Sequence, residues 1–169
     1  IEGSEVSPSK IVSLTKQNRC QSISYTYTEP TIYFEYAFEI ARQAHQGGIK
    51  NIFVTNGYMT EEALKTIQPY LDAANVDLKS FREEFYKEVC GAKLKPVLEN
   101  LKQMRQMGIW VEITTLIIPT LNDSDQEFEE IAQFIVSLGR EVPWHISAFY
   151  QTYKMLKLPR TPVSALHRA

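Results

Sequence analysis

The chain of 169 residues lacks the features that would assign it to a membrane or a nucleic-acid-binding class. It contains no apolar run close to the roughly 18 residues that a membrane-spanning helix needs. Its first residues are neither basic nor followed by an apolar stretch, so we expect no signal peptide. A formal net charge of −2 gives no general attraction to nucleic acid or anionic lipid, so we expect neither as a partner.

Cysteine is also scarce. The two cysteines, Cys20 and Cys90, lie far apart in the sequence, and their spacing fits neither a disulfide framework nor a metal site. We interpret both as ordinary thiols of a reducing compartment, which predicts a cytoplasmic location. No metal ligand and no catalytic residue is assigned within the chain.

What the chain does contain is an alternation of helical and strand-like segments, long enough for one domain with a sizeable core. Capping residues and apolar periodicity predict helices at 8–17, 31–46, 81–89, 94–107 and 126–138, and another after a Thr60 cap. Strands are predicted at 22–27, 51–55, 73–78, 109–118 and 144–149. Such alternation favours right-handed crossovers and a parallel sheet.

Five strands are too few to close the usual eight-stranded barrel. The predicted fold class is therefore α/β, either an open sheet or a partial, open barrel. The chain begins with a helix that no strand precedes, whereas a βα repeat normally begins with its strand. We therefore expect the first strand of the fold to be missing from this chain.

Thr28-Glu-Pro30 is the most informative segment. We expect a strand that stops at Pro30 and a helix that starts near Thr31, with the proline in the first helical turn. Ligands bind at the carboxyl ends of strands in repeated β/α folds. A hydroxyl, a carboxylate and free backbone groups in that place suit a small ligand that carries an amine. The alternative is a strand that merely ends in a helix cap.

Other polar residues also follow the predicted strands. Thr55 and Asn56 follow the second strand, and Asp77 and Lys79 follow the third. A lysine that emerges from a buried strand either contacts an anionic group or works as a neutral amine. Further polar residues lie late in, or after, the last two strands: Thr114, Thr115, His145, Ser147 and Tyr150.

Each of these residues also has a purely structural interpretation. Asn56-Gly57 is a good turn in its own right. Asp77 and Lys79 could form a local ion pair, and His145 beside Trp144 could be a hydrogen-bonded histidine of the core. The whole set is more persuasive than any one member, because parallel strands bring these ends to one rim.

Five segments in order resemble the radical S-adenosylmethionine (SAM) proteins, most closely the AmmeMemoRadiSam-system branch, a relative of the pyruvate formate-lyase activating enzymes. The resemblance covers essentially the whole chain. The segments are Ser24-Tyr-Thr-Tyr-Thr-Glu-Pro-Thr-Ile-Tyr-Phe-Glu-Tyr36, Val54-Thr-Asn-Gly-Tyr-Met-Thr60, Asp72-Ala-Ala-Asn-Val-Asp-Leu-Lys79, Phe85-Tyr-Lys-Glu-Val-Cys-Gly-Ala92 and Thr115-Leu-Ile-Ile-Pro-Thr-Leu-Asn-Asp123.

The resemblance implies a partial (β/α)₆ barrel of the TIM type. In that family the first strand and its loop carry a Cys-x₃-Cys-x₂-Cys motif, which binds a [4Fe–4S] cluster whose fourth iron SAM chelates. This sequence has no such motif, and neither Cys20 nor Cys90 matches it. We therefore expect a fragment that starts just after the cluster loop. The alternative is a natural protein that has lost its cluster.

The resemblance also implies a SAM site. Thr28, Glu29 and Pro30 occupy the place of the family's Gly-Gly-Glu motif, which binds the SAM amino group. Thr55 and Asn56 match the segment that approaches the ribose and the methionine moiety. Other relatives have an aspartate where Thr55 stands, so a ribose contact there would be weaker.

Asp77 and Lys79 match a segment whose lysine faces the SAM carboxylate, and Leu116 lies near the segment that flanks adenine. We expect any SAM affinity of the isolated chain to depend on Glu29 and Lys79. The last strand departs from the branch, because Ala148 and Tyr150 stand where it usually has arginine and histidine.

The implied organisation is a radical SAM core at 1–153 and an irregular tail at 154–169, with a short helix from Val163. The implied activity is reductive cleavage of SAM to a 5′-deoxyadenosyl radical. That radical takes hydrogen from a protein glycyl site or a small molecule, with flavodoxin or ferredoxin as electron donor. We expect this chain alone to be inactive. The alternatives are an aldolase-like barrel with Lys79 as Schiff-base nucleophile, or a non-catalytic nucleotide-binding or scaffold domain.

Overall fold

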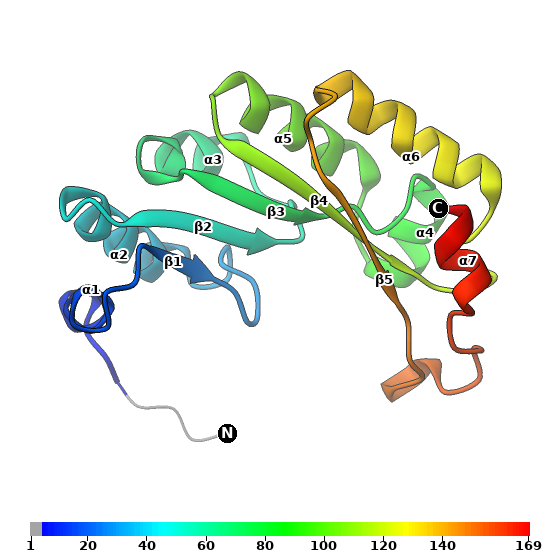
Figure 1. The fold of residues 1–169 in the computed structure, drawn as a ribbon, viewed down its shortest axis with the longest axis horizontal. Coiled ribbons are helices and arrows are strands. Elements are labelled where there is room, and N and C mark those ends of the chain that lie inside the picture. Colours follow the sequence, from blue (N-terminus) through cyan, green and yellow to red (C-terminus); the bar gives the residue numbers. More distant parts are fainter. Residues whose placement is uncertain (1–4) are drawn as a thin grey trace.

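The computed structural model describes residues 5–169 and contains one parallel sheet of five strands in the order β1-β2-β3-β4-β5. Consecutive strands are neighbours throughout, and β1 and β5 form the two edges. The sheet is curved and does not close, so the prediction of a partial, open barrel is confirmed (Figure 1). The strands are β1 (Ser22–Tyr25), β2 (Lys50–Thr55), β3 (Ala73–Asp77), β4 (Trp110–Ile117) and β5 (Trp144–Ala148).

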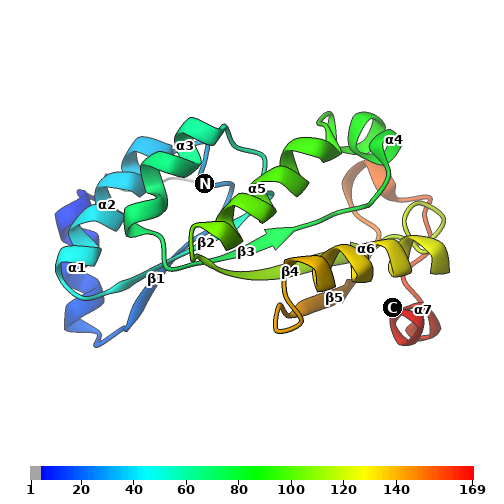
Figure 2. The same ribbon diagram turned by 90° about the horizontal axis from the view of Figure 1, so that it is seen from above.

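The helices that connect the strands lie on one face of this sheet. Figures 1 and 2 show α2, α3, α5 and α6 side by side over the convex face, while none of the described helices covers the concave face. The helices are α1 (Pro8–Gln17), α2 (Phe34–Gln46), α3 (Glu61–Ile67), α4 (Glu83–Phe85), α5 (Leu94–Gln106), α6 (Asp125–Leu138) and α7 (Val163–Arg168), with short helical turns η1 (Gln68–Tyr70), η2 (Tyr86–Cys90) and η3 (Tyr153–Met155).

The core lies between the sheet and these helices, because side chains alternate along each strand. On β4 the side chains of Val111, Ile113 and Ile117 are buried under the helices. The side chains between them, such as Glu112 and Leu116, face the open concave side. This alternation makes the concave face the more polar one, and the sheet therefore offers it to solvent or to other molecules.

Hydroxyl side chains cap three of the helices at their N-termini. Ser7, Thr60 and Ser124 accept hydrogen bonds from the backbone N–H groups of the third residue into each helix. The cap predicted at Thr60 is confirmed, and Ser7 caps the helix predicted at 8–17. Such a cap satisfies one of the free N–H groups of the first turn, and replacing it typically costs about 1 kcal/mol.

Two predicted boundaries are wrong. β1 ends at Tyr25, and α2 begins at Phe34 with Tyr33 as its N-cap, so Pro30 is not in the first helical turn. The reason is a turn between strand and helix, in which the Glu29 carbonyl accepts from the Ile32 N–H at 3.0 Å. The glutamate is thereby turned toward β2 instead of capping α2.

The predicted helix at 81–89 is also interrupted. It consists of the short α4 followed by the π-helical turn η2, which ends at Gly91. Gly91 has φ 65°, a left-handed conformation that glycine adopts without strain. The wider π-helical turn displaces Tyr86 and Cys90 from the positions that a regular helix would give them.

The tail covers the carboxyl ends of β4 and β5. The buried Thr161 hydroxyl donates to the Ile117 carbonyl at 2.6 Å and accepts from the Phe149 N–H at 2.7 Å. The predicted short helix from Val163 is present as α7, whose Ala165 packs against Ile117 and Phe128. The domain boundary at residue 153 stays a prediction. Within residues 5–169 we find no helix with the length and apolar character needed to cross a bilayer.

Packing of α6 on the sheet generates a stability prediction. Ile131 is fully buried, whereas Val136 on the same helix is 55% exposed. We expect Ile131→Ala to lower the free energy of unfolding by about 2–5 kcal/mol, because it leaves a cavity in the core. Val136→Ala should change it by no more than about 0.5 kcal/mol. Urea unfolding of both variants measures the difference, and equal losses would contradict this packing.

Candidate functional site

The strands end at two adjoining cavities. A polar cavity of about 360 Å³ lies at the ends of β1, β2 and β3, and its lining includes Thr28, Glu29, Thr55, Asn56, Asp77 and Lys79. An apolar cavity of about 440 Å³ lies beside it, lined by Phe85, Tyr86, Val89, Cys90, Leu116 and Ile118 among others. Asn56 and Lys79 line both cavities. Every residue that the family resemblance assigned to the SAM site lines one of them except Pro30, which is buried and lines neither.

Glu29 holds a buried carboxylate at the wall of the polar cavity. Its Oε1 accepts from the Thr55 hydroxyl at 2.6 Å and the Thr31 hydroxyl at 3.2 Å, and its Oε2 accepts from the Asn56 N–H at 2.8 Å. Only 8% of the residue is exposed, and within residues 5–169 no basic side chain pairs with it. Neutral donors compensate this charge only in part, so an added cation would be favourable here.

Asn56 forms the predicted turn and also lines both cavities. Its Oδ1 accepts from the Tyr58 N–H at 2.8 Å, which closes an Asx turn. Gly57 in this turn has φ 71°, and a Cβ there would lie 2.7 Å from a Val76 methyl group. The turn therefore needs this glycine, and it places Asn56 where the two cavities meet.

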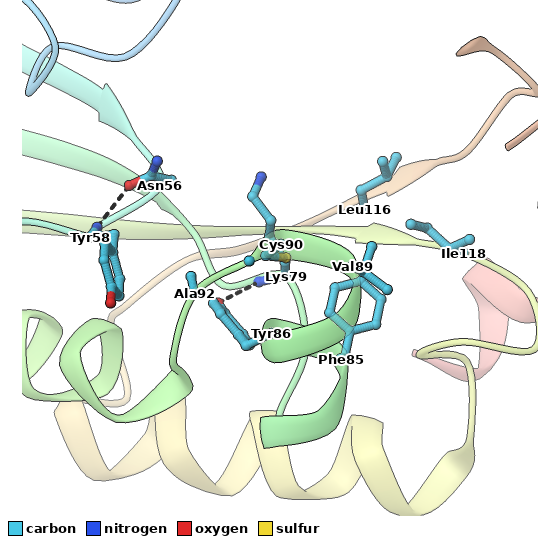
Figure 3. Close-up of a pocket in the computed structure, with 11 residues that line it drawn as sticks. Asn56, Tyr58, Lys79, Phe85, Tyr86, Val89, Cys90, Ala92, Leu116 and Ile118 are labelled. Carbon is cyan, nitrogen blue, oxygen red and sulfur yellow. Dashed lines mark hydrogen bonds between the residues drawn. The ribbon is translucent and has the colours of Figure 1, made fainter. Parts of the chain in front are cut away.

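Lys79 pairs with Asp77, as the structural alternative predicted. The Lys79 Nζ lies 2.8 Å from Asp77 Oδ2, and both side chains are about 40% exposed. Figure 3 shows the lysine rising between Asn56 on one side and Leu116 on the other. The ion pair therefore stands at the wall that both cavities share, with the ammonium group still accessible.

The apolar cavity is built largely by residues that were not predicted to belong to the site. Phe85, Tyr86, Val89 and Cys90 come from the interrupted helical segment. Of the predicted site residues, Asn56, Lys79 and Leu116 line this cavity. Burial raises the pKa of the Cys90 thiol, and the nearby Lys79 ammonium opposes that shift. The resemblance marked the 85–92 segment as a motif, but the π-helical turn that directs it to the cavity has no simple sequence signal.

The polar residues of the last two strands do not join the cavities. His145 is exposed and its Nε2 lies 2.9 Å from Glu112 Oε2, so the core-histidine alternative is wrong. Thr115 is buried and donates to the Leu78 carbonyl at 2.9 Å. Tyr150 stacks under the Arg160 guanidinium, 4.1 Å from the ring centroid. Thr114 and Ser147 lie outside both linings as well.

Neither of the two cysteines lines the polar cavity. Cys20 is exposed and Cys90 is half-buried, and both are free thiols. Among residues 5–169, no three His, Cys, Asp or Glu side chains gather in an arrangement that could hold a metal ion.

A protein-family comparison matches residues 1–135 to the family described as the Radical SAM superfamily. An uncharacterised protein of Methanocaldococcus jannaschii is 43% identical over 98% of this chain and 49% of its own length. The 4-hydroxyphenylacetate decarboxylase activating enzyme of Clostridium scatologenes is 24% identical over 67% of this chain and 37% of its own length. A pyruvate formate-lyase-activating enzyme is also among the relatives. The chain thus spans half or less of the length of these relatives.

Solved structures with this fold include Streptococcus suis SuiB bound to S-adenosylmethionine. The TM-score is 0.77 at 14% sequence identity, over 99% of this chain and 40% of that one. At this level of identity the likeness concerns the fold alone. It agrees with the open, barrel-like sheet described above.

The contacts of Glu29 generate a stability prediction. In Glu29→Gln, one carboxylate oxygen becomes an NH₂ group that faces a hydroxyl or backbone N–H donor. We expect a loss of about 1–3 kcal/mol in the free energy of unfolding. Glu84→Gln, at an exposed position in α4, is the control and should change it by less than about 0.5 kcal/mol. Urea titration of both proteins decides, and an unchanged Glu29→Gln protein would refute the acceptor role.

The pair of Glu112 and His145 on the concave face generates a pH prediction. Hydrogen bonds from the Trp110 indole and from His145 hold the pKa of Glu112 below its usual value. A carboxyl whose pKa is lowered on folding adds stability above its unfolded pKa of about 4.3 and loses it as the pH falls through the lower folded pKa. The stability difference between the unmutated protein and Glu112→Gln should therefore shrink below about pH 4. Unfolding measured across that range tests it, and a pH-independent difference would count against the lowered pKa.

Proposed function

The chain belongs to the radical SAM superfamily, and on that premise we propose that its two adjoining cavities form the SAM-binding part of a radical SAM enzyme. The observation that carries this proposal is the junction at Asn56 and Lys79, where a polar cavity meets an apolar one. SAM has a charged amino-acid end and a flat purine end joined by a ribose. One molecule could therefore occupy both cavities across that junction.

The polar cavity suits the amino-acid end. Glu29 supplies a buried negative charge without a cationic partner among the described residues, which favours an ammonium group, and Thr28 lies next to it. The accessible Lys79 ammonium would bind the carboxylate, with Asp77 holding the lysine in place at 2.8 Å. Opposite charges on two sides of the cavity match the two charges of an amino acid.

The apolar cavity suits the nucleoside end. It has an apolar lining, in which a purine ring could be buried away from water, made by Phe85, Val89, Leu116 and Ile118. Thr55 and Asn56 lie between the two ends, near the ribose. The Thr55 hydroxyl donates to Glu29, so its contribution to ribose binding would be weak, as the missing aspartate also indicates.

The residues of this chain do not fit an iron–sulfur cluster. Cys20 and Cys90 are the only cysteines, and Cys20 lies in the loop between α1 and β1 whereas Cys90 ends η2. We therefore place the cluster ligands outside this chain, which spans half or less of the length of its relatives. SAM and a [4Fe–4S] cluster together supply a carbon-centred radical that abstracts hydrogen. The contribution of this chain is to bind and orient SAM and to exclude water, so it should be inactive alone.

The finer assignments belong to the same proposal. Relatives named as activating enzymes support a protein substrate, including a glycyl site, over a small molecule. A flavodoxin or ferredoxin would supply the electron, and a reducing cytoplasm would be the place of action. The aldolase-like alternative is disfavoured by the Asp77–Lys79 pair, because a Schiff-base lysine must react as a neutral amine.

The two cysteines provide a test of this proposal within one chain. Cys90 lines the apolar cavity, whereas Cys20 is exposed and lines neither cavity. We expect saturating SAM or adenosine to slow alkylation of Cys90 by N-ethylmaleimide by about tenfold or more, as expected for a thiol buried by a bound ligand. Alkylation of Cys20 should not change. Mass spectrometry of the two cysteine peptides gives both rates.

Methionine is the control ligand, because it should bind in the polar cavity and leave Cys90 reactive. Calorimetry with SAM measures binding independently of the thiols. Absence of heat together with unchanged Cys90 alkylation would overturn the SAM site. Equal protection of Cys20 and Cys90 would indicate a general effect on the fold and would also contradict it.

A further inference from the structure

We propose that Tyr86 and Asn122 are positioning residues that hold Lys79 and set the wall shared by the two cavities. This inference rests on the proposed function of the cavities. Neither residue was predicted from the sequence to belong to the site. The backbone at Lys79 is bonded on its two sides by these two buried side chains, which come from different parts of the fold.

Tyr86 bonds the amide side of Lys79. The Lys79 N–H donates to the Tyr86 hydroxyl oxygen at 3.1 Å, as the dashed line in Figure 3 shows. Tyr86 is only 3% exposed, and burial raises the pKa of its hydroxyl above the ordinary value. The hydroxyl therefore stays neutral, and its oxygen is an acceptor placed where the N–H leaves the sheet ladder.

Asn122 bonds the carbonyl side. Its Nδ2 donates to the Lys79 carbonyl at 2.6 Å and to the Leu116 carbonyl at 2.9 Å, while its Oδ1 accepts from the Ile118 N–H at 2.6 Å. Lys79, Leu116 and Ile118 all line the apolar cavity. One carboxamide, 1% exposed, thus joins the segments that follow β3 and β4 and uses both of its N–H donors.

The residues after Lys79 are held in the same way. The buried Glu127 on α6 accepts from the Ser80 hydroxyl and from the Phe81 N–H. The segment 79–81 is therefore bonded by η2, by the loop before α6 and by α6 itself. Preorganisation of this kind lowers the ordering cost that a ligand would otherwise meet on binding.

A purely structural role would produce the same hydrogen bonds, so the test needs matched residues elsewhere. Tyr25 is 4% exposed and its hydroxyl donates to Asn51 Oδ1 at 2.9 Å. Asn51 is fully buried and donates to the Ala41 and Tyr70 carbonyls. Neither residue lines the two cavities. Tyr25 and Asn51 thus provide a buried tyrosine hydroxyl and a buried carboxamide, both hydrogen-bonded, outside the two cavity linings.

The experiment compares Tyr86→Phe and Asn122→Ala with Tyr25→Phe and Asn51→Ala. We expect all four variants to lose stability in urea. Only the first two should weaken SAM binding in calorimetry, by about three- to tenfold for one or two lost hydrogen bonds. Hydrogen exchange at the Lys79 amide should speed up in Tyr86→Phe and stay unchanged in Tyr25→Phe.

The outcomes separate the two proposals. A chain that binds SAM with the same affinity in all four variants would overturn the positioning role and leave the SAM site standing. An unmutated chain that does not bind SAM would overturn the proposed function. Unchanged Lys79 exchange in Tyr86→Phe would remove the positioning role whatever the affinity. If Asn122→Ala fails to fold, Tyr86→Phe alone decides, because it removes one oxygen and keeps the ring.

Discussion

The constraint on which this structure depends is the backbone left unpaired where parallel strands end. Each N–H and C=O that leaves the sheet ladder inside the protein needs another partner, because a buried unpaired group costs about 1–3 kcal/mol. Here buried side chains supply the partners. Glu29 accepts from the Asn56 N–H, Tyr86 accepts from the Lys79 N–H, and Asn122 bonds groups beyond β4. The strand ends are therefore fixed, and the cavities between them have defined walls.

The same arrangement determines the charges at the site. Neutral donors hydrogen-bond the buried Glu29 carboxylate, and no cationic side chain among the described residues pairs with it. Lys79 pairs with Asp77 at a half-exposed position. The polar cavity thus has one anionic and one cationic wall, while the apolar cavity beyond Asn56 is lined mainly by apolar side chains. The combination favours a ligand that is an amino acid at one end and apolar at the other.

Much of this could be predicted from the sequence, because the signals are local. Capping residues such as Ser7 and Thr60 mark helix starts, and polar residues directly after buried strands mark the rim. The start of α2 could not be predicted, because Glu29 hydrogen-bonds with Thr55 and Asn56 at the end of β2, far along the chain, and Pro30 then lies before the helix. Tyr86 was missed for a related reason: an aromatic residue in a helical segment reads as core, and only the π-helical turn brings its hydroxyl to Lys79.

Binding and reaction depend on different parts of the protein under this proposal. Side chains and backbone groups within residues 5–169 hold the walls of both cavities through hydrogen bonds. The radical chemistry, in contrast, needs cluster ligands that Cys20 and Cys90 do not provide. An affinity measured on this chain would therefore report the contribution of the cavity walls alone. The difference from the affinity of the complete enzyme would then give the contribution of the parts outside this chain, the cluster included.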